Sequence, residues 1–211
     1  LRYDIFKATK PGHLYKEIQL RNSGNDFKRP MMKDAFLQSI VMHRMDVDYQ
    51  AYEPAIIFMN GVYCGIENMR ERSNKDYVFS NYGLDDDDVT LIEATYKDVD
   101  SHNDMPTDSS FIELSNFLKS NPISDDDNFK KACERIDVDE FINYLMLEIY
   151  VGNVDWPYNN VKMWKRTVDG RWRWILMDVE YSYGLGRRSH NTLTFALGEN
   201  MASLIGGYST L

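Results

Sequence analysis

The sequence has few cysteines, no long apolar run and no excess of basic residues, and each shortage excludes a class of protein. Cys64 and Cys133 allow one disulfide but no disulfide framework or zinc site, and we expect both in the core. Because the apolar runs are far shorter than the roughly 20 residues that cross a bilayer, we expect no membrane span. The net charge of −9, without a basic stripe, argues against nucleic acid as a partner.

Internal repeats, linkers and natural chain ends are also missing. We therefore expect residues 1–211 to form one domain, taken from a longer protein and truncated at both ends, so that the sequence does not give its compartment. The 43% of hydrophobic residues and 13% of aromatics exclude a disordered chain and predict a globular fold with a substantial core.

The first half of the sequence indicates a sheet with one helix. Alternating apolar residues predict strands over 1–6 and 14–20, separated by a turn at Lys10-Pro11-Gly12. Pro30 is expected to begin a helix that continues to Met45. Its core face is expected to carry Met32, Phe36, Ile40 and Met45.

A hairpin and a short capped helix follow. Asn60-Gly61 lies between the apolar segments Pro54–Met59 and Val62–Asn68, and this dipeptide favours both positive φ angles of a type I′ turn. Ser73 resembles a helix cap, Gly83 a helix end, and residues 89–94 a further strand.

The second half indicates a helical block that leads into a second hairpin. Residues 96–108 lack periodicity and are expected to form a surface excursion that includes His102. Helices are expected over 110–120, 125–135 and 137–151, the last of them starting at Asp137 and stopped by Gly152. The fold class predicted from these patterns is α+β.

The stretch from Asn153 to Glu180 has the residue pattern of a metal-dependent phosphotransfer site. A polar loop carries Asp155 and Asn160, and a hairpin turning at Asp169-Gly170 over Val161–Met177 leads to Asp178. Because a hairpin reverses the chain, we expect these side chains at one edge of the sheet, with oxygen ligands for Mg²⁺.

The order of these parts matches that of protein kinases. There, a helix leads to a catalytic Asp, an Asn five residues later binds metal, and a second Asp after a hairpin binds Mg²⁺. The present sequence lacks the His-Arg before the first Asp, the Phe-Gly after the second, and a Gly-rich phosphate loop.

Four motifs make the resemblance to one family specific. They are Leu20-Arg21-Asn22 with Asp26, the run Pro54 to Gly65 continuing to Glu71, Asp155-Trp156 with Asn160, and Trp174-Ile175-Leu176-Met177-Asp178. At these positions the sequence resembles the spore-coat protein H (CotH) kinase family of atypical kinases. The resemblance covers most of the chain. It implies a protein-kinase-like core, with an N-terminal antiparallel sheet and hairpin, a helical block, and a catalytic loop followed by a hairpin.

The resemblance also implies an activity and roles for particular residues. The expected activity is Mg²⁺/ATP-dependent transfer of phosphate to Ser or Thr hydroxyls of a protein, in a spore coat, cell envelope or secreted setting. Asp155 is then the catalytic acid/base residue, while Asn160 and Asp178 hold Mg²⁺. Glu180 stands where the family often has a second Asp, and is expected to supply an oxygen ligand. Glu71 is expected near the nucleotide.

The source of a phosphate-binding cation stays open. The strand that supplies this lysine in the family begins at or before Leu1, so we expect the lysine upstream, and Lys7 and Lys16 are poor substitutes. Lys162, on a strand beside the catalytic loop, could reach a phosphate, or could be an exposed strand lysine.

Other interpretations remain for the same residues. Asp155, Asn160 and Asp178 could be turn and cap residues only, in a kinase-like binding module without catalysis. Asp155 and Asp178 could instead be the paired carboxylates of a glycosidase. The four tryptophans, Trp156, Trp164, Trp172 and Trp174, are expected to pack in the core rather than form a base-stacking platform.

Overall fold

The computed structural model of the chain describes residues 3–94, 108–157, 159–185 and 189–197. The helices in these ranges are α1 (Lys33–Val41), α2 (Lys75–Tyr82), α3 (Ser109–Ser120), α4 (Asp126–Cys133), α5 (Val138–Val151) and α6 (Thr192–Leu197). The strands are β1 (Gln19–Arg21), β2 (Tyr52–Met59), β3 (Val62–Arg70), β4 (Val89–Ala94), β5 (Val161–Arg166) and β6 (Arg173–Ile175). Short 3₁₀ turns cover Gly24–Asp26, Asp86–Asp88 and Val179–Tyr181.

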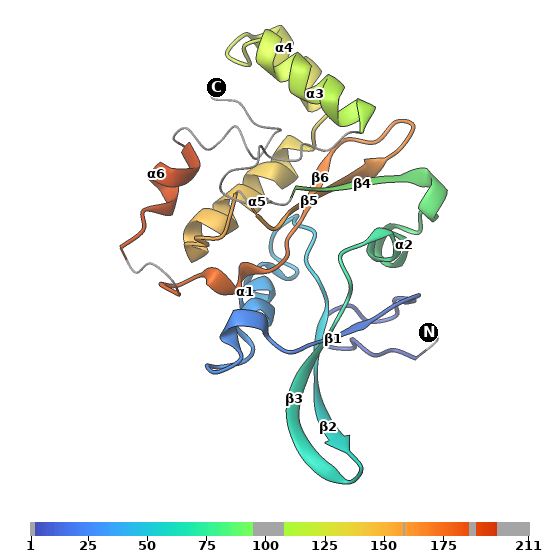
Figure 1. Ribbon diagram of the computed structural model, residues 1–211. Helices are drawn as coiled ribbons and strands as arrows, with labels where there is room; N and C mark the ends of the chain where they lie inside the picture. The colour runs from blue at the N-terminus through green and yellow to red at the C-terminus, as the bar shows by residue number, and fades with distance from the viewer. Residues whose placement is uncertain (1–2, 95–107, 158, 186–188, 198–211) are drawn as a thin grey trace.

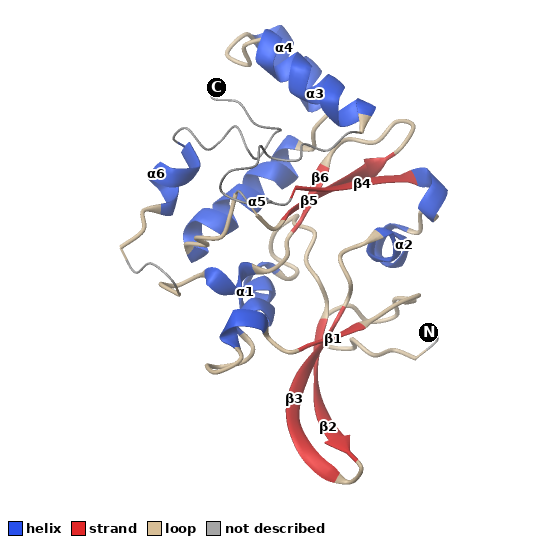
Figure 2. Cartoon of the chain, in the orientation of Figure 1, coloured by secondary structure: helices blue, strands red, loops and turns tan. Residues whose placement is uncertain are grey.

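The strands form two small antiparallel sheets, so the expected α+β class is confirmed (Figures 1 and 2). The first sheet has the order β1-β3-β2, and the second has the order β4-β5-β6. Helices α3 and α4 lie at the opposite end of the molecule from the β2–β3 hairpin. None of the described helices combines the length and the apolar character of a membrane span.

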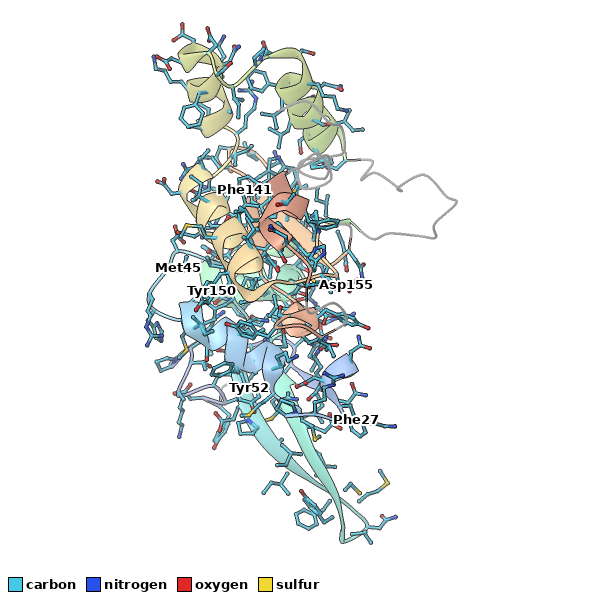
Figure 3. All side chains as sticks on the ribbon, turned by 90° about the vertical axis from the view of Figure 1, so that its left-hand side faces the viewer. Phe27, Met45, Tyr52, Phe141, Tyr150 and Asp155 are labelled. Atoms are coloured by element: carbon cyan, nitrogen blue, oxygen red, sulfur yellow. The ribbon has the colours of Figure 1, made fainter. Side chains whose placement is uncertain are left out.

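The β2–β3 hairpin turns where its sequence predicts. Asn60 and Gly61 have φ angles of 50° and 81°, the two positive values that a type I′ turn requires. The outer half of this hairpin projects beyond the other side chains of the molecule (Figure 3). Its exposed large apolar residues are Ile56, Phe58, Met59, Val62, Tyr63 and Ile66.

The largest apolar cluster lies between α5 and the second sheet. Trp174 of β6 is fully buried, and its ring lies 4.3 Å, centroid to centroid, from that of Phe141. The indole Nε1 of the buried Trp156 donates to the hydroxyl of Tyr144, 2.9 Å away. All four tryptophans are buried, which confirms that they pack in the core. This packing fixes both α5 and the loop that follows it.

Glu140 of α5 is an acid within this core. Its side chain is fully buried, one carboxylate oxygen accepts from the backbone N–H of Trp174, and the other has no partner. Burial raises the pKa of Glu140 to about 9, with a further rise from Asp48 that Arg173 opposes. The folded protein therefore holds a proton on Glu140 at neutral pH.

This proton makes the stability of the protein depend on pH. The folded pKa lies above the unfolded one, so the contribution is complete below about pH 4.5 and is lost as pH rises toward 9. Glu140→Gln keeps the acceptor for Trp174 without a titrating group. We expect the variant to gain stability over the wild type between pH 5 and pH 8, by at most about 1.4 kcal/mol per pH unit. Urea unfolding at several pH values measures this. The exposed Glu113→Gln is the control, and equal pH profiles for wild type and Glu140→Gln would contradict the expectation.

The two strands expected near the N-terminus are largely absent. Leu1 and Arg2 lie outside the described residues, and residues 5–9 form turns. Of the second expected strand, 14–20, only Gln19 and Leu20 pair in a sheet, as part of β1. Phe6 and Tyr15 instead pack edge to face in a small separate cluster, with ring centroids 4.9 Å apart. The apolar residues of these segments divide between this cluster, against which Ile5 and Ile18 pack, and solvent, where Tyr3, Leu14 and Leu20 are exposed.

Helix α1 is shorter than expected and presents a different face. Met31 has a φ of 62°, so the helix begins at Lys33 rather than at Pro30. Met32 and Phe36 are exposed, whereas Leu37 and Val41 are in the core, with Ile40 and Met45 packed partly against it. Helix α1 contacts the Val179–Tyr181 turn, and Val179 lies in the same apolar cluster as Leu37 and Val41.

Helices α2 to α5 match their expected ranges within a few residues, whereas α6 was not predicted from the sequence. The cap of α2 is Asn74, which accepts from the N–H of Tyr77, and not Ser73. Gly83 and Gly152 end α2 and α5 with positive φ angles, as expected. The excursion over 96–108, with His102, lies almost entirely outside the described residues.

The cysteine prediction is wrong in part. Both cysteines are free thiols, but Cys64 is exposed on the β2–β3 hairpin and Cys133 is half-buried at the end of α4. Cys64 lies on the outer half of the hairpin, which no other element of the described chain covers, so its apolar surroundings in the sequence do not become a core.

Candidate functional site

The loop that carries Asp155 is fixed by buried polar contacts. Gly152 ends α5, and the fully buried Asn153 then donates from its side chain to Glu148 of the same helix, at 2.9 Å. The oxygen of the Asn153 amide accepts the backbone N–H of Asp155, at 3.2 Å. Because Asn153 is held from both sides, it sets the position at which Asp155 leaves the helix.

Asp155 and Asn160 lie in contact. The amide nitrogens of Asn159 and Asn160 both donate to Oδ2 of Asp155, at 3.2 and 3.0 Å. Asn160 has a φ of 60°, a conformation that asparagine tolerates better than most residues. With its nitrogen committed to Asp155, Asn160 has its carbonyl oxygen left as a ligand atom.

The second hairpin brings Asp178 to the same end of the sheet. Lys162 of β5 pairs with Ile175 of β6, so that Asn160 precedes and Asp178 follows this pair by no more than three residues. A backbone bond of 3.2 Å from Val154 N–H to the carbonyl of Tyr181 ties the two loops together. Strand β6 ends at Ile175, earlier than expected.

Asp178 and Glu180 are joined through Arg21 of β1. Nη2 of Arg21 lies 2.6 Å from Oδ1 of Asp178 and 2.8 Å from Oε2 of Glu180. Asp178 has a φ of 53°, so the extended backbone of β6 does not continue through it. The strand that begins the fold therefore reaches the end of the second hairpin.

Glu180 is enclosed, whereas Asp178 is not. The side chain of Glu180 is 2% exposed, and its second oxygen accepts the backbone N–H of Asn25 at 2.6 Å. Gly24 packs so closely on this carboxylate that a Cβ there would collide with it. The side chain of Asp178 is 26% exposed. Of these two acids, only Asp178 has a carboxylate open to a ligand.

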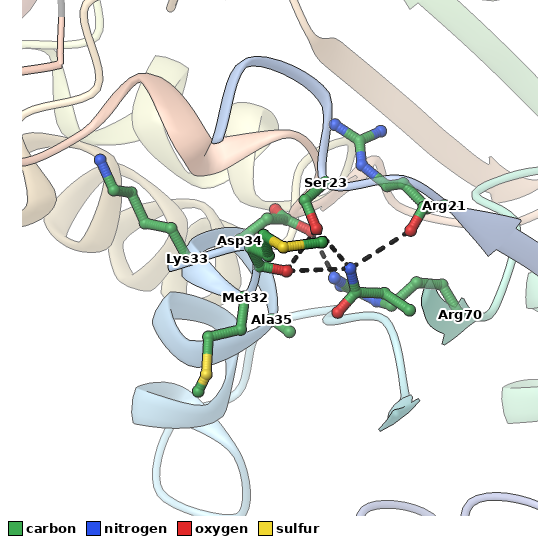
Figure 4. A pocket seen from close by; sticks show the side chains of 9 residues that line it. Arg21, Ser23, Met32, Lys33, Asp34, Ala35 and Arg70 are labelled. Atoms are coloured by element: carbon green, nitrogen blue, oxygen red, sulfur yellow. Dashed lines mark hydrogen bonds and ion pairs between the residues drawn. The ribbon is translucent and has the colours of Figure 1, made fainter. Parts of the chain in front are cut away.

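A buried ion pair holds the backbone next to this cluster. Asp34 of α1 pairs with Arg70 of β3, and its other oxygen accepts the backbone N–H of Val179 at 3.0 Å. Figure 4 shows both residues beside a small cavity, where the side chain of Asn68 reaches Ser23. Asp34 thus holds the backbone next to Asp178.

These charges shift pKa values in opposite directions. Burial raises the pKa of Asp178 to about 7; Arg21 opposes this rise, and the carboxylates of Glu180 and Asp34 add to it. Burial would also raise the pKa of Asp34, but Arg70 and Arg21, together with hydrogen bonds from Gln38 and Val179, hold that pKa below its ordinary value. The site concentrates negative charge, which a divalent cation would relieve.

Glu71 lies in a separate buried cluster that the sequence does not reveal. One oxygen accepts from Nζ of Lys10 and from the N–H of Ala51, at 2.6 and 2.7 Å, and the other accepts from Asn81 at 2.9 Å. Lys10 also lies over the ring of Tyr49. Lys10 and Glu71 are 61 positions apart, and no local pattern links them.

Lys162 is buried, and the interpretation of an exposed strand lysine is wrong. Its Nζ donates to the backbone oxygen of Ser73 at 2.8 Å and lies 2.9 Å from Oε2 of Glu93. Glu93 faces Lys162 across β4 and β5. Lys162 therefore links the second sheet to the segment that follows β3.

The oxygen atoms of this site limit how it could hold Mg²⁺. In the described part of the chain, no group of three or more His, Cys, Asp or Glu side chains is arranged to hold a metal ion. Asp178 and Asn160 nevertheless offer one carboxylate and one amide oxygen, which suits an ion that keeps several waters and binds phosphate oxygens. These two residues fit Mg²⁺ bound together with a nucleotide.

The family comparison agrees with the sequence motifs. The family model described as CotH kinase protein matches residues 2–206, so the chain belongs to the CotH kinase family. A search of curated proteins found no match.

Arg21 and Asp34 are the site residues whose roles sequence reasoning missed. Arg21 lies within a motif shared with the family, but its contacts are 157 and 159 positions away, with Asp178 and Glu180. The pairing of Asp34 with Arg70 spans 36 positions. The signal in the sequence that could have pointed to Arg21 is its positive charge at the end of an expected strand.

Proposed function

We propose that this protein is a Mg²⁺/ATP-dependent phosphotransferase, an atypical protein kinase that acts on Ser or Thr hydroxyls of a protein. The observation that carries the proposal is the β5–β6 register, which puts Asn160 and Asp178 at one end of the hairpin, with Asp155 bonded to Asn160. Membership of the CotH kinase family supports the same chemistry.

The proposal includes a protein-kinase-like core. The first sheet with α1 would form one side of the nucleotide site, and α5 with the second sheet would form the other. The contact of α1 with the Val179–Tyr181 turn supports this arrangement, because it joins the first half of the chain to the segment beside Asp178.

Asp155 is the residue we assign to proton acceptance. Its carboxylate is half-buried, and both asparagine contacts are made to Oδ2, so these amides orient it without donating to Oδ1. From this position it would accept the proton of the attacking hydroxyl.

Asn160 and Asp178 are the residues that would hold Mg²⁺. When bound, the ion neutralises charge on the transferred phosphate and orients the nucleotide. We assign Glu180 to holding Arg21 and the backbone of Asn25 rather than to binding Mg²⁺, because these two residues occupy its oxygens. Glu71 and Lys162 are assigned to support of the fold rather than to direct nucleotide contact, because buried partners hold both.

Transfer of labelled phosphate tests the proposal. The 211-residue chain, mixed with ³²P-labelled ATP, Mg²⁺ and an acceptor protein, should label itself or the acceptor. The label should fall sharply in Asp155→Asn and Asp178→Asn. Label that persists in both variants would contradict the assignment.

Thermal unfolding with Mg-ATP separates the enzyme from a binding module that lacks nucleotide. Ligand at 100 times its Kd should stabilise the fold by about 2.7 kcal/mol. We expect a rise in melting temperature at millimolar Mg-ATP. An unchanged melting temperature, together with absent transfer, would favour the non-catalytic module.

A further inference from the structure

We propose that Arg21 is the phosphate-binding cation of this site. In the nucleotide-free protein it holds the Asp178 and Glu180 carboxylates, and it donates to a nucleotide phosphate oxygen when Asp178 binds Mg²⁺. This inference rests on the proposed function, and it replaces the lysine that we expected upstream of Leu1.

The position of Arg21 meets the first requirement, contact with the metal ligand. Its Nη2 lies 2.6 Å from Oδ1 of Asp178, so a phosphate that shares Mg²⁺ with Asp178 would lie within reach of the same guanidinium. The backbone oxygen of Arg21 accepts from the amide of Asn68, at 3.2 Å, and β1 pairs with β3 at this point. The strand therefore fixes the base of the side chain.

The guanidinium also has donors to spare. Both ion pairs use Nη2, and Nε is buried without a partner. Within the described residues, no acceptor is recorded for Nη1. An arginine has five N–H donors in a planar fork that matches two phosphate oxygens. Arg21 therefore has N–H donors that the described residues do not pair.

Solvent reaches the side chain of Arg21, and the residue also lines an open surface groove with Gln19, Leu20, Asn22, Ile57 and Glu67. The side chain of Arg21 is 26% exposed. A charged ligand can therefore approach the guanidinium from solvent.

The three buried cations of the described residues have other partners. Lys10 is enclosed against Glu71, and Lys162 against Glu93 and Ser73. Arg70 is 1% exposed and pairs with Asp34. Among these buried or half-buried cations, Arg21 is the one that touches Asp178.

The test compares ATP with adenosine by isothermal titration, in the presence of Mg²⁺. A hydrogen bond to a charged group justifies an expected 10- to 100-fold loss of ATP affinity in Arg21→Gln. Adenosine lacks phosphate, so its affinity should stay within about twofold, because the change removes only phosphate contacts. The control is Arg72→Gln, an exposed arginine paired with Glu17, which should leave both affinities unchanged.

Mg²⁺ alone gives a second readout that moves in the opposite direction. Arg21→Gln removes the cation from Asp178, so Mg²⁺ without nucleotide should raise the melting temperature of the variant more than that of the wild type. A purely structural role would lower the melting temperature and weaken every ligand alike. Arg21→Lys, which keeps the charge but loses the fork, should bind ATP about 3- to 10-fold more weakly, and it replaces Arg21→Gln if that variant fails to fold.

The outcomes distinguish the two proposals. If the wild type binds Mg-ATP and Arg21→Gln binds it equally well, the role of Arg21 is overturned and the proposed function stands. If ATP and adenosine affinities fall together, Arg21 is structural and its role is again overturned. If the wild type binds no Mg-ATP, the proposed function fails, and the role of Arg21 fails with it.

Discussion

Asp155→Asn is expected to lower the rate of phosphate transfer by roughly 10²- to 10⁴-fold, the usual loss when a general base is removed. The asparagine keeps an oxygen that can accept from Asn160, so the loop should hold its shape. Nucleotide binding should therefore stay nearly intact. Single-turnover transfer measures the rate, and isothermal titration measures binding.

Asp178→Asn should fail in a different way. It removes the charged oxygen that we assign to Mg²⁺, so Mg²⁺-dependent nucleotide binding should weaken along with transfer. Asp169→Asn, at the exposed turn of the second hairpin, is a matched control that should change neither. If Asp155→Asn lost nucleotide binding as fully as Asp178→Asn, both acids would have to be treated as metal ligands.

Arg70→Met is expected to lower the free energy of unfolding by about 3–5 kcal/mol, because it leaves the buried Asp34 carboxylate without its cation. Arg70 is 1% exposed, and its Nε also donates to the backbone oxygen of Ala51 at 3.1 Å. Methionine restores much of the volume but neither contact. Urea unfolding of the variant and the wild type gives the difference.

A double variant separates the lost charge pairing from the lost packing. Arg70→Met leaves the charge of Asp34 unpaired, and Asp34→Asn removes that charge. The amide oxygen of the new asparagine can still accept from the N–H of Val179. The pair of substitutions should therefore destabilise the protein less than the sum of the two single ones. Arg72→Met, at an exposed arginine, should change stability little. If the double variant lost as much free energy of unfolding as the two single variants added together, the ion-pair explanation would be contradicted.

Local patterns were sufficient for elements whose partners are close in the sequence. Asn60-Gly61 predicts its hairpin because the backbone preference of two residues decides the turn. Asp125 and Gly152 mark helix ends through bonds to residues a few positions away. The strands expected near the N-terminus are largely absent, because alternation in the sequence does not specify a pairing partner.

The residues of the candidate site also separate into those placed by local sequence and those placed by distant contacts. The sequence by itself determined Asp155, Asn160 and Asp178, since a loop and a short hairpin bring them to one edge. Only the tertiary structure decided which partners Arg21, Glu180 and Lys162 contact. Their charged partners lie many positions away, such as Asp178 at 157 positions from Arg21, and Glu93 at 69 positions from Lys162. A charged side chain takes whichever partner folding brings within about 3 Å, and chain order does not specify that partner.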